Sequence, residues 1–373
     1  MVLVEPQDFW QDLFGHEEGR SETIHLEMRM VRKHGRPFLL LPRQSGAASA
    51  VVDLYPAQTL RARVARKLLG WLLHAPVAVG TERIALTLSA EDAFVKLLAS
   101  LASIPTSEVP TFGILAGNPA SDGQRFLILV FDTNQKPVAV VKAGLTARAI
   151  ELIRHEELFL GSVPGGIEGI PALRATFDSF RMRALVLDFF TGDSPRVNDE
   201  DAMARLLSCW VHRQEKVRLS ELSGWTRCAS ASAIAWFPAL ARRIGQQFLH
   251  PAIRHGDFAP WNIKVSPRGA WTVLDWERSE LTGIPAWDWF HYVIQTGILV
   301  ERQPTSRLAS RVESLLTSAS FQQYAEYCGI AGLERELALA YLVHCVEVIK
   351  PSEGLSAARE LLRALHERWV NVR

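Results

Sequence analysis

The chain has 373 residues, of which 48% are hydrophobic and 22% are charged, an ordinary composition for a folded protein that argues against long disorder. At roughly 150 residues per domain, this length predicts two or three domains. The 41 lysines and arginines almost balance the 40 aspartates and glutamates, for a net charge of +1. Without a basic field to neutralise phosphates, general binding of nucleic acid is not expected.

The cysteines and the apolar runs bear on the compartment. The four cysteines are too far apart for a zinc knuckle or a redox pair and too few for a disulfide framework, so reduced thiols are expected. The N-terminus is acidic and has no basic region before an apolar run, so no signal peptide is predicted. The most apolar run, 68–80, is shorter than the roughly 18–20 residues that cross a bilayer. A cytoplasmic protein without a membrane partner is therefore expected.

Residues 1–106 are predicted to form an accessory α/β module. Apolar runs at 37–42 and 49–54 favour strands, and basic residues interleaved with apolar ones favour an amphipathic helix over 59–73. A second helix is expected over 90–101, and Pro105 marks the end of the module. No catalytic spacing occurs in this segment, so the chemistry is expected to lie after it.

Residues 107–192 have the order strand, strand, strand, helix, strand, strand, which predicts a small antiparallel sheet that carries one helix. Residues 193–373 are mostly helical in pattern, except at 253–290, where short strands alternate with turns. The expected strands are 111–115, 126–131, 137–142, 173–177 and 183–189, and the expected helices are 146–161, 202–214, 231–249, 306–320, 333–349 and 355–370.

The segment 253–265, IRHGDFAPWNIKV, sets Asp257 five residues before Asn262 in a turn-rich loop. Asp275 follows at the end of an apolar strand, thirteen residues later. Three oxygen-bearing side chains are thereby expected at one end of a short hairpin. Phosphoryl transfer uses such groups, because a carboxylate orients the attacking hydroxyl and hard oxygen ligands hold Mg²⁺. This ordered set is far more specific than a lone His-x-Asp sequence.

The segment resembles the catalytic loop of the aminoglycoside phosphotransferase and choline kinase family, small-molecule kinases with a protein-kinase-like fold. Residues 255–263 (HGDFAPWNI) resemble the loop itself, 273–277 (VLDWE) the metal-binding strand end, and 283–288 (GIPAWD) the element that follows it. The resemblance implies a bilobal α+β fold, with an antiparallel-sheet N-lobe at 107–192 and a mostly helical C-lobe at 193–373. It does not include residues 1–106, which are expected as an extra N-terminal α/β module.

The resemblance implies a role for each residue of the set. Asp257 would be the catalytic carboxylate that accepts the proton of the substrate hydroxyl. Asn262 and Asp275 would bind Mg²⁺ on the phosphates of ATP, so the expected cofactors are ATP and Mg²⁺. His255 is expected to pack and hydrogen-bond so that it holds the loop, and Asp288 is expected to be largely structural.

Nucleotide binding also requires a cation before this loop. Lys142 ends the apolar run 137–142, where an unpaired ammonium is expensive to bury. It therefore needs anions, which ATP phosphates and a carboxylate on the next helix would supply. The spacing of the family favours Glu156 as that carboxylate and leaves Glu157 as the alternative.

The segment 185–190 (LVLDFF) resembles the hinge between the two lobes, where backbone groups of Asp188 and Phe190 would hold the adenine ring. One feature departs from the pattern of protein kinases. The glycines between residues 113 and 123 lack the G-x-G-x-x-G spacing of a phosphate-covering loop, so the contacts of such a loop are not assigned.

The function predicted from this resemblance is ATP- and Mg²⁺-dependent phosphorylation of a hydroxyl group on a small molecule, such as a sugar, an amino alcohol or a related metabolite, with an aminoglycoside as a further option. One alternative is a protein kinase, which the missing D-F-G and A-P-E sequences weaken. The other is a nucleotide-binding pseudokinase that acts as a scaffold. Because every catalytic element lies after residue 106, a chain that starts near Ser107 is expected to bind ATP with similar affinity.

Overall fold

The computed structural model describes residues 10–14, 23–55, 60–73, 81–117, 123–196, 199–351 and 353–370. The chain divides into two compact units. The first consists of Met1–Gly161 and Pro171–Phe190, and the second of Ser162–Ile170 and Thr191–Arg373. Among the described residues, no helix combines the length and the apolar character that a membrane span requires.

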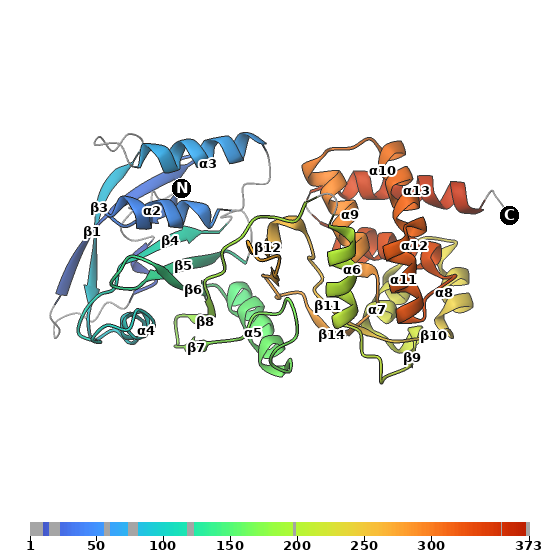
Figure 1. Ribbon diagram of the computed structural model, residues 1–373, viewed down its shortest axis with the longest axis horizontal. Helices are drawn as coiled ribbons and strands as arrows, with labels where there is room; N and C mark the ends of the chain where they lie inside the picture. Colours follow the sequence, from blue (N-terminus) through green and yellow to red (C-terminus); the bar gives the residue numbers. More distant parts are fainter. Residues whose placement is uncertain are drawn as a thin grey trace. The chain divides into compact units, whose positions relative to one another are not determined.

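The first unit is built on one antiparallel sheet of eight strands (Figure 1). The strands are β1 (Thr23–Lys33), β2 (Arg36–Leu41), β3 (Glu82–Ser89), β4 (Phe112–Ala116), β5 (Arg125–Phe131), β6 (Pro137–Gly144), β7 (Ala175–Asp178) and β8 (Arg183–Asp188). They lie in the order β3-β1-β2-β4-β5-β6-β8-β7. Strands β4, β5 and β6 form the predicted meander, and helix α5 (Ala147–Ser162) follows β6 as expected.

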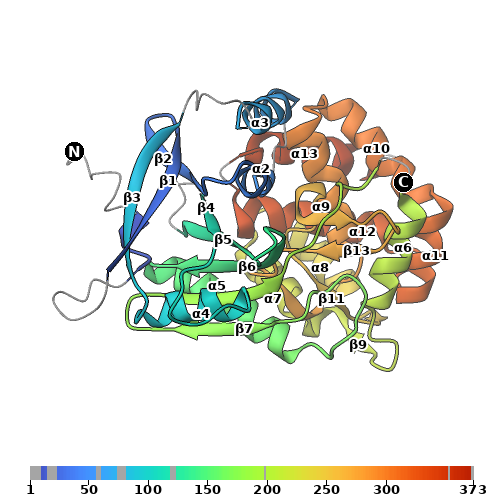
Figure 2. The same cartoon turned by 60° about the vertical axis from the view of Figure 1, so that its left-hand side comes forward.

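Apolar side chains on the two faces of this sheet form two separate cores. Along β5, Phe126 and Ile128 point into one core, whereas Leu129 and Phe131 point into the other. This alternation is what a strand with both faces buried requires. Helix α4 (Ala93–Leu101) contributes to the first core, and helices α2 (Ser45–Asp53) and α3 (Leu60–Leu72) lie beside each other over the second (Figure 2).

The sheet runs without interruption across residue 106, where the sequence places a domain boundary. Strand β2 pairs with β4, with Leu40 opposite Ile114. Helix α2 lies so close to β4 that a Cβ on Gly113 would come within 2.4 Å of the Val51 side chain, an approach that glycine alone permits. Residues before and after position 106 share both cores. The N-terminal segment therefore supplies strands and helices to the same unit as the meander.

Part of the local structure in this segment differs from the prediction. Residues 49–54 are not a strand: all but the last lie in α2, because Val51 and Val52 belong to a helical face that packs on the sheet. A short apolar run does not by itself distinguish a strand from a buried helix. Strands β1 and β3 were not predicted, because charged residues interrupt the alternation of apolar residues along them.

The amphipathic helix predicted over 59–73 is present as α3, with residue 59 outside the described residues. Leu69 and Leu73 pack into the second core. Val64 and Leu68, which the sequence places on the apolar face, are instead exposed, as is Trp71. The helix thus uses only part of its apolar surface to contact the sheet.

The second unit is mostly helical, as predicted. Its helices are α6 (Glu200–Cys209), α7 (Ser223–Ala231), α8 (Phe237–Gly245), α9 (Trp287–Gln295), α10 (Thr305–Thr317), α11 (Ala319–Cys328), α12 (Glu334–Val343) and α13 (Leu355–Val370). The single helix expected over 231–249 is wrong, because α7 ends at Ala231 and a new helix starts at Phe237, with a proline in its first turn. Its short strands pair as β9 (Val217–Arg218) with β10 (Phe248–Leu249), β11 (Ala252–Arg254) with β14 (Glu280–Gly283), and β12 (Ile263–Val265) with β13 (Trp271–Val273).

The predicted α+β class is confirmed by this division of structure. Antiparallel strands dominate the first unit and helices dominate the second. The chain passes from the first unit to the second after Phe190, and the second unit also contains Ser162–Ile170, a segment that lies inside the predicted range 107–192.

Candidate active site

The loop between β11 and β12 is fixed by one buried carboxylate. Asp288, at the start of α9, accepts hydrogen bonds from the backbone N–H groups of His255 at 2.6 Å and Gly256 at 2.9 Å. Gly256 has a φ of +81°, and a Cβ there would lie 2.5 Å from the carbonyl oxygen of Arg278. Glycine is therefore required at this position. The structural role expected of Asp288 agrees with these contacts.

His255 ties the same loop to the following hairpin. Its Nε2 lies 2.8 Å from the carbonyl oxygen of Leu274, and its Nδ1 lies 3.1 Å from the backbone nitrogen of Asp257. These partners assign a neutral ring that donates from Nε2 and accepts at Nδ1. Complete burial lowers the pKa of His255 in spite of the nearby carboxylates, which keeps the ring neutral. The ring holds the loop, as the sequence predicts.

The carboxylate of Asp257 is hydrogen-bonded on both oxygens and still reachable. Asn262 donates from Nδ2 to Oδ2 at 3.0 Å, and Nε2 of His291 lies 3.1 Å from Oδ1. The Asp257 side chain is 31% exposed, so a substrate has access to it. Burial alone would raise the pKa of Asp257, but the hydrogen bond from His291, together with the charge of Arg278, outweighs burial and lowers the pKa. The group is therefore an ionised carboxylate at neutral pH.

Asn262 and Asp275 lie at the same end of the β12–β13 hairpin. The backbone N–H of Leu274 donates to the carbonyl oxygen of Asn262 at 2.7 Å, which brings the residues beside it together. Nδ2 of Asn262 donates to Asp257, so the amide oxygen Oδ1 is the atom of this side chain that could bind a cation. Asp275 has a φ of +67°, a strained backbone conformation for a residue other than glycine. The three side chains selected from the sequence thus lie around one loop and one hairpin end.

The donor set around this hairpin fits Mg²⁺. Among the residues that the structure describes, no group of three or more His, Cys, Asp or Glu side chains is placed to hold an ion. Mg²⁺ commonly binds through one or two protein oxygens and completes its octahedral shell with phosphate oxygens and water. Oδ1 of Asn262 and the carboxylate of Asp275 match that requirement.

In the first unit, Lys142 on β6 and Glu156 on α5 form a buried ion pair. Nζ of Lys142 lies 2.7 Å and 2.9 Å from the two carboxylate oxygens of Glu156. The two side chains are 5% and 0% exposed. Glu157 turns to a different partner, Arg183, at 2.7 Å. Of the two carboxylates that the sequence leaves open, Glu156 is thus the one that pairs with Lys142.

Asp188 and Phe190 lie where the first unit ends. Asp188 is the last residue of β8, opposite Ala139 on β6, and its exposed carboxylate lies 3.4 Å from the guanidinium of Arg174. Phe190 follows the strand and is half-buried. The role of their backbone groups in holding adenine stays a prediction.

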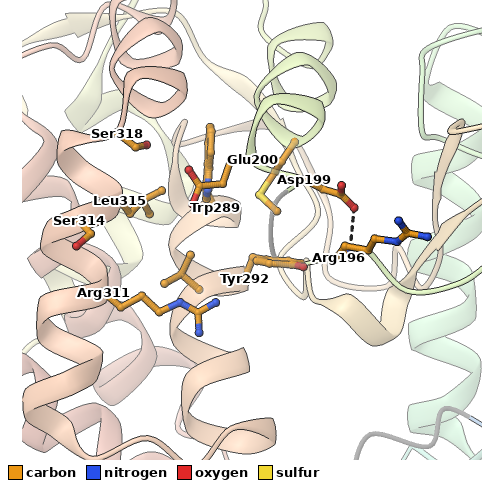
Figure 3. Close-up of a pocket in the computed structure, with 11 residues that line it drawn as sticks. Arg196, Asp199, Glu200, Trp289, Tyr292, Arg311, Ser314, Leu315 and Ser318 are labelled. Atoms are coloured by element: carbon orange, nitrogen blue, oxygen red, sulfur yellow. Dashed lines mark hydrogen bonds between the residues drawn. The ribbon is translucent and has the colours of Figure 1, made fainter.

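A cavity of about 300 Å³ opens in the second unit between the start of α6 and the helices α9 and α10 (Figure 3). Arg311 in its wall is already paired with Glu301 at 2.6 Å. The guanidinium of Arg196 points away from the other lining residues in Figure 3. The lining residues are Arg196, Asp199, Glu200, Met203, Trp289, Tyr292, Val293, Arg311, Ser314, Leu315 and Ser318.

This cavity lies near the Asp257 loop. Tyr292 lines the cavity, and the ring of Tyr292 lies 5.9 Å from that of Phe258, the residue after Asp257. The preceding residue on α9, His291, contacts the Asp257 carboxylate itself. Burial raises the pKa of Tyr292 to about 12, so its hydroxyl stays protonated. Two adjacent residues of α9 therefore contact the Asp257 carboxylate and the cavity wall.

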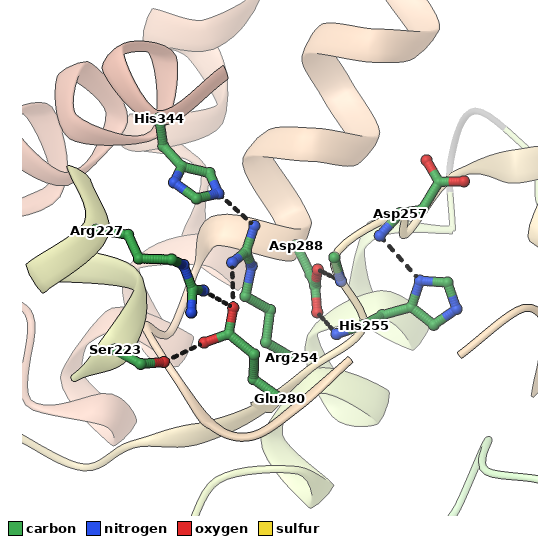
Figure 4. A network of polar contacts seen from close by, with 9 residues as sticks. Ser223, Arg227, Arg254, His255, Asp257, Glu280, Asp288 and His344 are labelled. Carbon is green, nitrogen blue, oxygen red and sulfur yellow. Dashed lines mark hydrogen bonds and ion pairs between the residues drawn. The ribbon is translucent and has the colours of Figure 1, made fainter. Parts of the chain in front are cut away.

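A second set of polar residues supports the loop from the opposite side (Figure 4). Arg254, the last residue of β11, lies 2.7 Å from Glu280 on β14, and Arg227 on α7 lies 2.6 Å from the same carboxylate. Arg254 also lies 3.3 Å from Nε2 of His344. Burial and the two arginines lower the pKa of His344 to about 2, so this ring is neutral. The strand that enters the loop is thereby attached to α7 and to the helix region after α12.

Sequence reasoning missed His291 and the residues of this support. A signal was available for His291, because it lies three residues after Asp288 on the same helical face. Arg254 and Glu280 offered no such signal, since their pairing spans 26 residues of irregular structure.

No protein-family model and no curated protein sequence matches the chain. Solved structures are similar to it. A protein described as a fructosamine-3-kinase from Haemophilus somnus is 13% identical over 73% of this chain and 96% of its own, with a TM-score of 0.42. Aminoglycoside phosphotransferase APH(4)-Ia, in a complex with ADP and hygromycin B, is 11% identical over 73% of this chain and 97% of its own, with a TM-score of 0.43.

A choline kinase from Cryptosporidium parvum is 11% identical over 74% of this chain and 95% of its own, with a TM-score of 0.41. The descriptions of all three name kinases of the kind that the motifs resemble. Because the TM-scores lie below 0.5 and the identities are low, the likeness assigns no activity to this chain. The activity has to be inferred from its own residues.

Proposed function

We propose that this protein is an ATP- and Mg²⁺-dependent phosphotransferase that acts on a hydroxyl group of a small molecule. The observation that carries the proposal is the Asp257 carboxylate, which is ionised, half-buried and hydrogen-bonded on both oxygens. A carboxylate held in this way is suited to orient a hydroxyl and to take its proton. Asn262 and Asp275 beside it supply the oxygen ligands that such a transfer requires.

Each residue of the site has a separate role in the proposed phosphoryl transfer. The hydroxyl oxygen of the acceptor forms the new bond to the γ-phosphorus, the bond to the β–γ bridging oxygen breaks, and ADP leaves. Asp257 receives the hydroxyl proton, while His291 and Asn262 keep its carboxylate in place. Mg²⁺, when bound, neutralises charge on the phosphate oxygens. Asn262 and Asp275 would hold it, and Asp288 and His255 keep their loop rigid.

Lys142 is assigned to the nucleotide phosphates. A lysine buried on an apolar strand is stable as a cation only beside an anion, and Glu156 supplies one charge at 2.7 Å. In protein kinases a strand lysine paired with a helix glutamate contacts the α- and β-phosphates. The Lys142–Glu156 pair has the same chemical make-up, and Asp188 and Phe190 are assigned to adenine.

The acceptor is assigned to the cavity between α6, α9 and α10. A volume of about 300 Å³ suits a small molecule. Because Glu301 neutralises Arg311, the carboxylates of Asp199 and Glu200 dominate the charge of the lining. This balance favours an acceptor with an amino group and a hydroxyl, such as an amino alcohol or an amino sugar. The aromatic rings of Trp289 and Tyr292 offer apolar surface for its carbon skeleton.

A phosphate-transfer assay tests the proposal. The full chain is incubated with γ-labelled ATP and Mg²⁺ against a panel of hydroxylated small molecules, with and without amino groups. Phosphorylated product that disappears with EDTA and with Asp257→Asn supports it. Nucleotide binding without transfer to any acceptor would favour the scaffold alternative, and transfer to protein substrates alone would favour a protein kinase.

The acceptor assignment has its own test on one helix. Ser314→Trp fills the cavity from α10, whereas Ser310→Trp places the same ring one turn earlier, outside the lining. We expect Ser314→Trp to raise the KM for the acceptor at least about 10-fold, a loss of about 1.4 kcal/mol of binding, with the KM for ATP unchanged. Equal effects of the two variants would show that the acceptor does not bind in this cavity.

A further inference from the structure

A chain of three side chains leads from the interior of the second unit to Asp257. The hydroxyl of Tyr341 on α12 lies 3.0 Å from Nδ1 of His291 on α9. On the other side of the ring, Nε2 lies 3.1 Å from Oδ1 of Asp257. Tyr341 is fully buried and His291 is 5% exposed, so neither group exchanges these partners freely with water.

The partners determine which nitrogen of His291 carries the proton. A carboxylate only accepts hydrogen bonds, so Nε2 has to be the donor toward Asp257. In a neutral imidazole the other nitrogen then has no proton and accepts, which leaves the Tyr341 hydroxyl as the donor. Burial raises the pKa of Tyr341 well above its ordinary range, so that proton is always available. The hydrogen bonds therefore run from Tyr341 through His291 to Asp257.

We propose that His291 and Tyr341 are positioning residues for the Asp257 carboxylate, with the Tyr341 hydroxyl holding the His291 ring in place through its hydrogen bond to Nδ1; this rests on the proposed function. Asn262 holds Oδ2 and His291 holds Oδ1, so the two donors together fix the rotation of the carboxylate. Its exposed edge is then presented in one orientation. Small misplacements of a reacting group can lower a rate by about 10²-fold, so this orientation matters for turnover.

The ring of His291 is not explained by packing alone. It makes an edge contact with Tyr341 at a centroid distance of 6.1 Å, which an aliphatic or aromatic residue would also make. Only a side chain with a donor at the Nε2 position reaches Oδ1 of Asp257. Replacing the donor while keeping the volume therefore separates the two roles.

The first test compares His291→Leu with His291→Gln. Leucine fills the site but has no donor, whereas glutamine can place an amide N–H near the former Nε2. We expect His291→Leu to lower kcat by about 10–100-fold while the KM values for ATP and acceptor stay within about threefold. His291→Gln should recover most of the loss. Equal kcat values for the two variants, or losses that follow the melting temperature, would overturn the proposal.

The second test is a double-mutant cycle with Tyr341→Phe. If Tyr341 acts through His291, Tyr341→Phe alone lowers kcat, and adding it to His291→Leu lowers kcat no further. The matched control is Tyr324→Phe, which removes a buried hydroxyl that accepts from the backbone of Ala286 and does not contact His291. This control should change stability without changing the kcat ratio of the His291 variants. If the fold-losses in kcat of the two single variants multiply in the double variant, Tyr341 does not act through the His291 ring.

A measurement without turnover separates this inference from the proposed function. The chain has 11 histidines, and labelling them with ¹⁵N allows the chemical shifts of their ring nitrogens to be measured. The signal that is missing in His291→Gln belongs to His291. We expect the Nε2–H tautomer in the parent and in Tyr341→Phe, with the Nδ1 shift of the variant moved to that of a nitrogen that accepts no hydrogen bond. An Nδ1–H ring or an imidazolium at assay pH would overturn the hydrogen-bond direction. The expected shifts in a chain that phosphorylates nothing would support the hydrogen-bond chain and reject the proposed function.

Discussion

The two units of this protein bury polar groups in different ways. In the described part of the first unit, the buried polar and charged side chains are Gln11, Ser89, Lys142 and Glu156. In the second unit they are Arg254, His255, Asn262, Ser279, Asp288, His291, Gln295, Thr296 and His344. In the described part of the sheet unit the buried charged side chains are thus one ion pair, whereas the helical unit buries a larger polar set, several members of which hydrogen-bond around the Asp257 loop.

The difference follows from what each unit has to hold in place. A strand satisfies its backbone through the neighbouring strands, so β6 can position Lys142 beside the Glu156 carboxylate without help from side chains at its own N–H groups. The loop around Asp257 lacks a regular ladder, and its buried N–H groups need side-chain acceptors such as Asp288. Substitutions in the first unit should therefore lower stability mainly by disturbing its apolar packing or its buried ion pair. Substitutions in the second unit should lower stability or activity mainly by removing single hydrogen bonds.

The largest effect is expected from deleting residues 1–106. The deletion removes β2 from the edge of β4 and opens both cores of the sheet. We expect the chain 107–373 to lose cooperative unfolding of the first unit, measured by circular dichroism, and to lose ATP affinity, measured by calorimetry. A soluble chain that binds ATP as the full chain does, which is what the sequence alone predicts, would show that the segment is a separable module.

The contact that joins the two segments can also be tested without deletion. Gly113→Ala puts a methyl group within 2.4 Å of Val51, whereas Gly161→Ala on α5 meets nothing within 4 Å. Overpacking of this kind costs about 1–3 kcal/mol of stability. The free energy of unfolding in urea should fall for Gly113→Ala and stay level or rise for Gly161→Ala. Equal values would mean that α2 does not pack on β4 as described.

Breaking the ion pair of the first unit should have the next largest effect. Lys142→Met leaves Glu156 as a fully buried charge without its cation, which costs about 3–5 kcal/mol of stability. Lys142→Met combined with Glu156→Leu should recover most of this loss and still fail to bind ATP. The adjacent Glu157→Gln, which weakens a less buried pair with Arg183, should cost about 1 kcal/mol or less. A mild effect of Lys142→Met would contradict the burial of the pair.

Two aspartates compare the units directly. Asp288 accepts one backbone N–H on each oxygen, whereas Asp92 at the start of α4 accepts the N–H groups of Phe94 and Val95 on the same oxygen. Asparagine keeps one carbonyl oxygen, so Asp92→Asn preserves both backbone bonds and loses only the ion pair of Oδ2 with Arg181 at 3.5 Å, whereas Asp288→Asn loses a bond to the backbone. We expect a loss of about 1–3 kcal/mol for Asp288→Asn and well under 1 kcal/mol for Asp92→Asn. Reversed magnitudes would show that the loop does not depend on Asp288.

The smallest effect is a pH dependence that arises in the second unit. The pKa of His344 is lowered to about 2 in the folded chain, against about 6.5 when unfolded. Below pH 6.5 the unfolded chain binds a proton that the folded chain does not, so stability falls as pH falls, by about 1.4 kcal/mol per pH unit. His344→Gln should be less sensitive between pH 7 and 5 in urea unfolding. Parallel pH curves for parent and variant would contradict this origin.

The sequence alone was enough to predict the parts that depend on near neighbours. The Asp257 loop, the strand that ends before Asp275 and the meander with its following helix all rest on spacings of a few residues and on apolar alternation. Asp257 and Asn262 meet because five residues of one loop separate them. The sequence did not decide between Glu156 and Glu157. Neighbouring side chains on a helix point about 100° apart, so the choice depends on how α5 is rotated against the sheet.

The tertiary structure decided whatever joins distant segments. No local pattern assigns β2 to β4, because every sheet edge offers the same backbone hydrogen bonds. The two shared cores and the packing of α2 on Gly113 favour this edge. The hydrogen-bond chain to Asp257 likewise spans 34 residues to His291 and a further 50 to Tyr341. Such contacts follow from how α9 and α12 pack, and a pattern read along the chain does not carry that information.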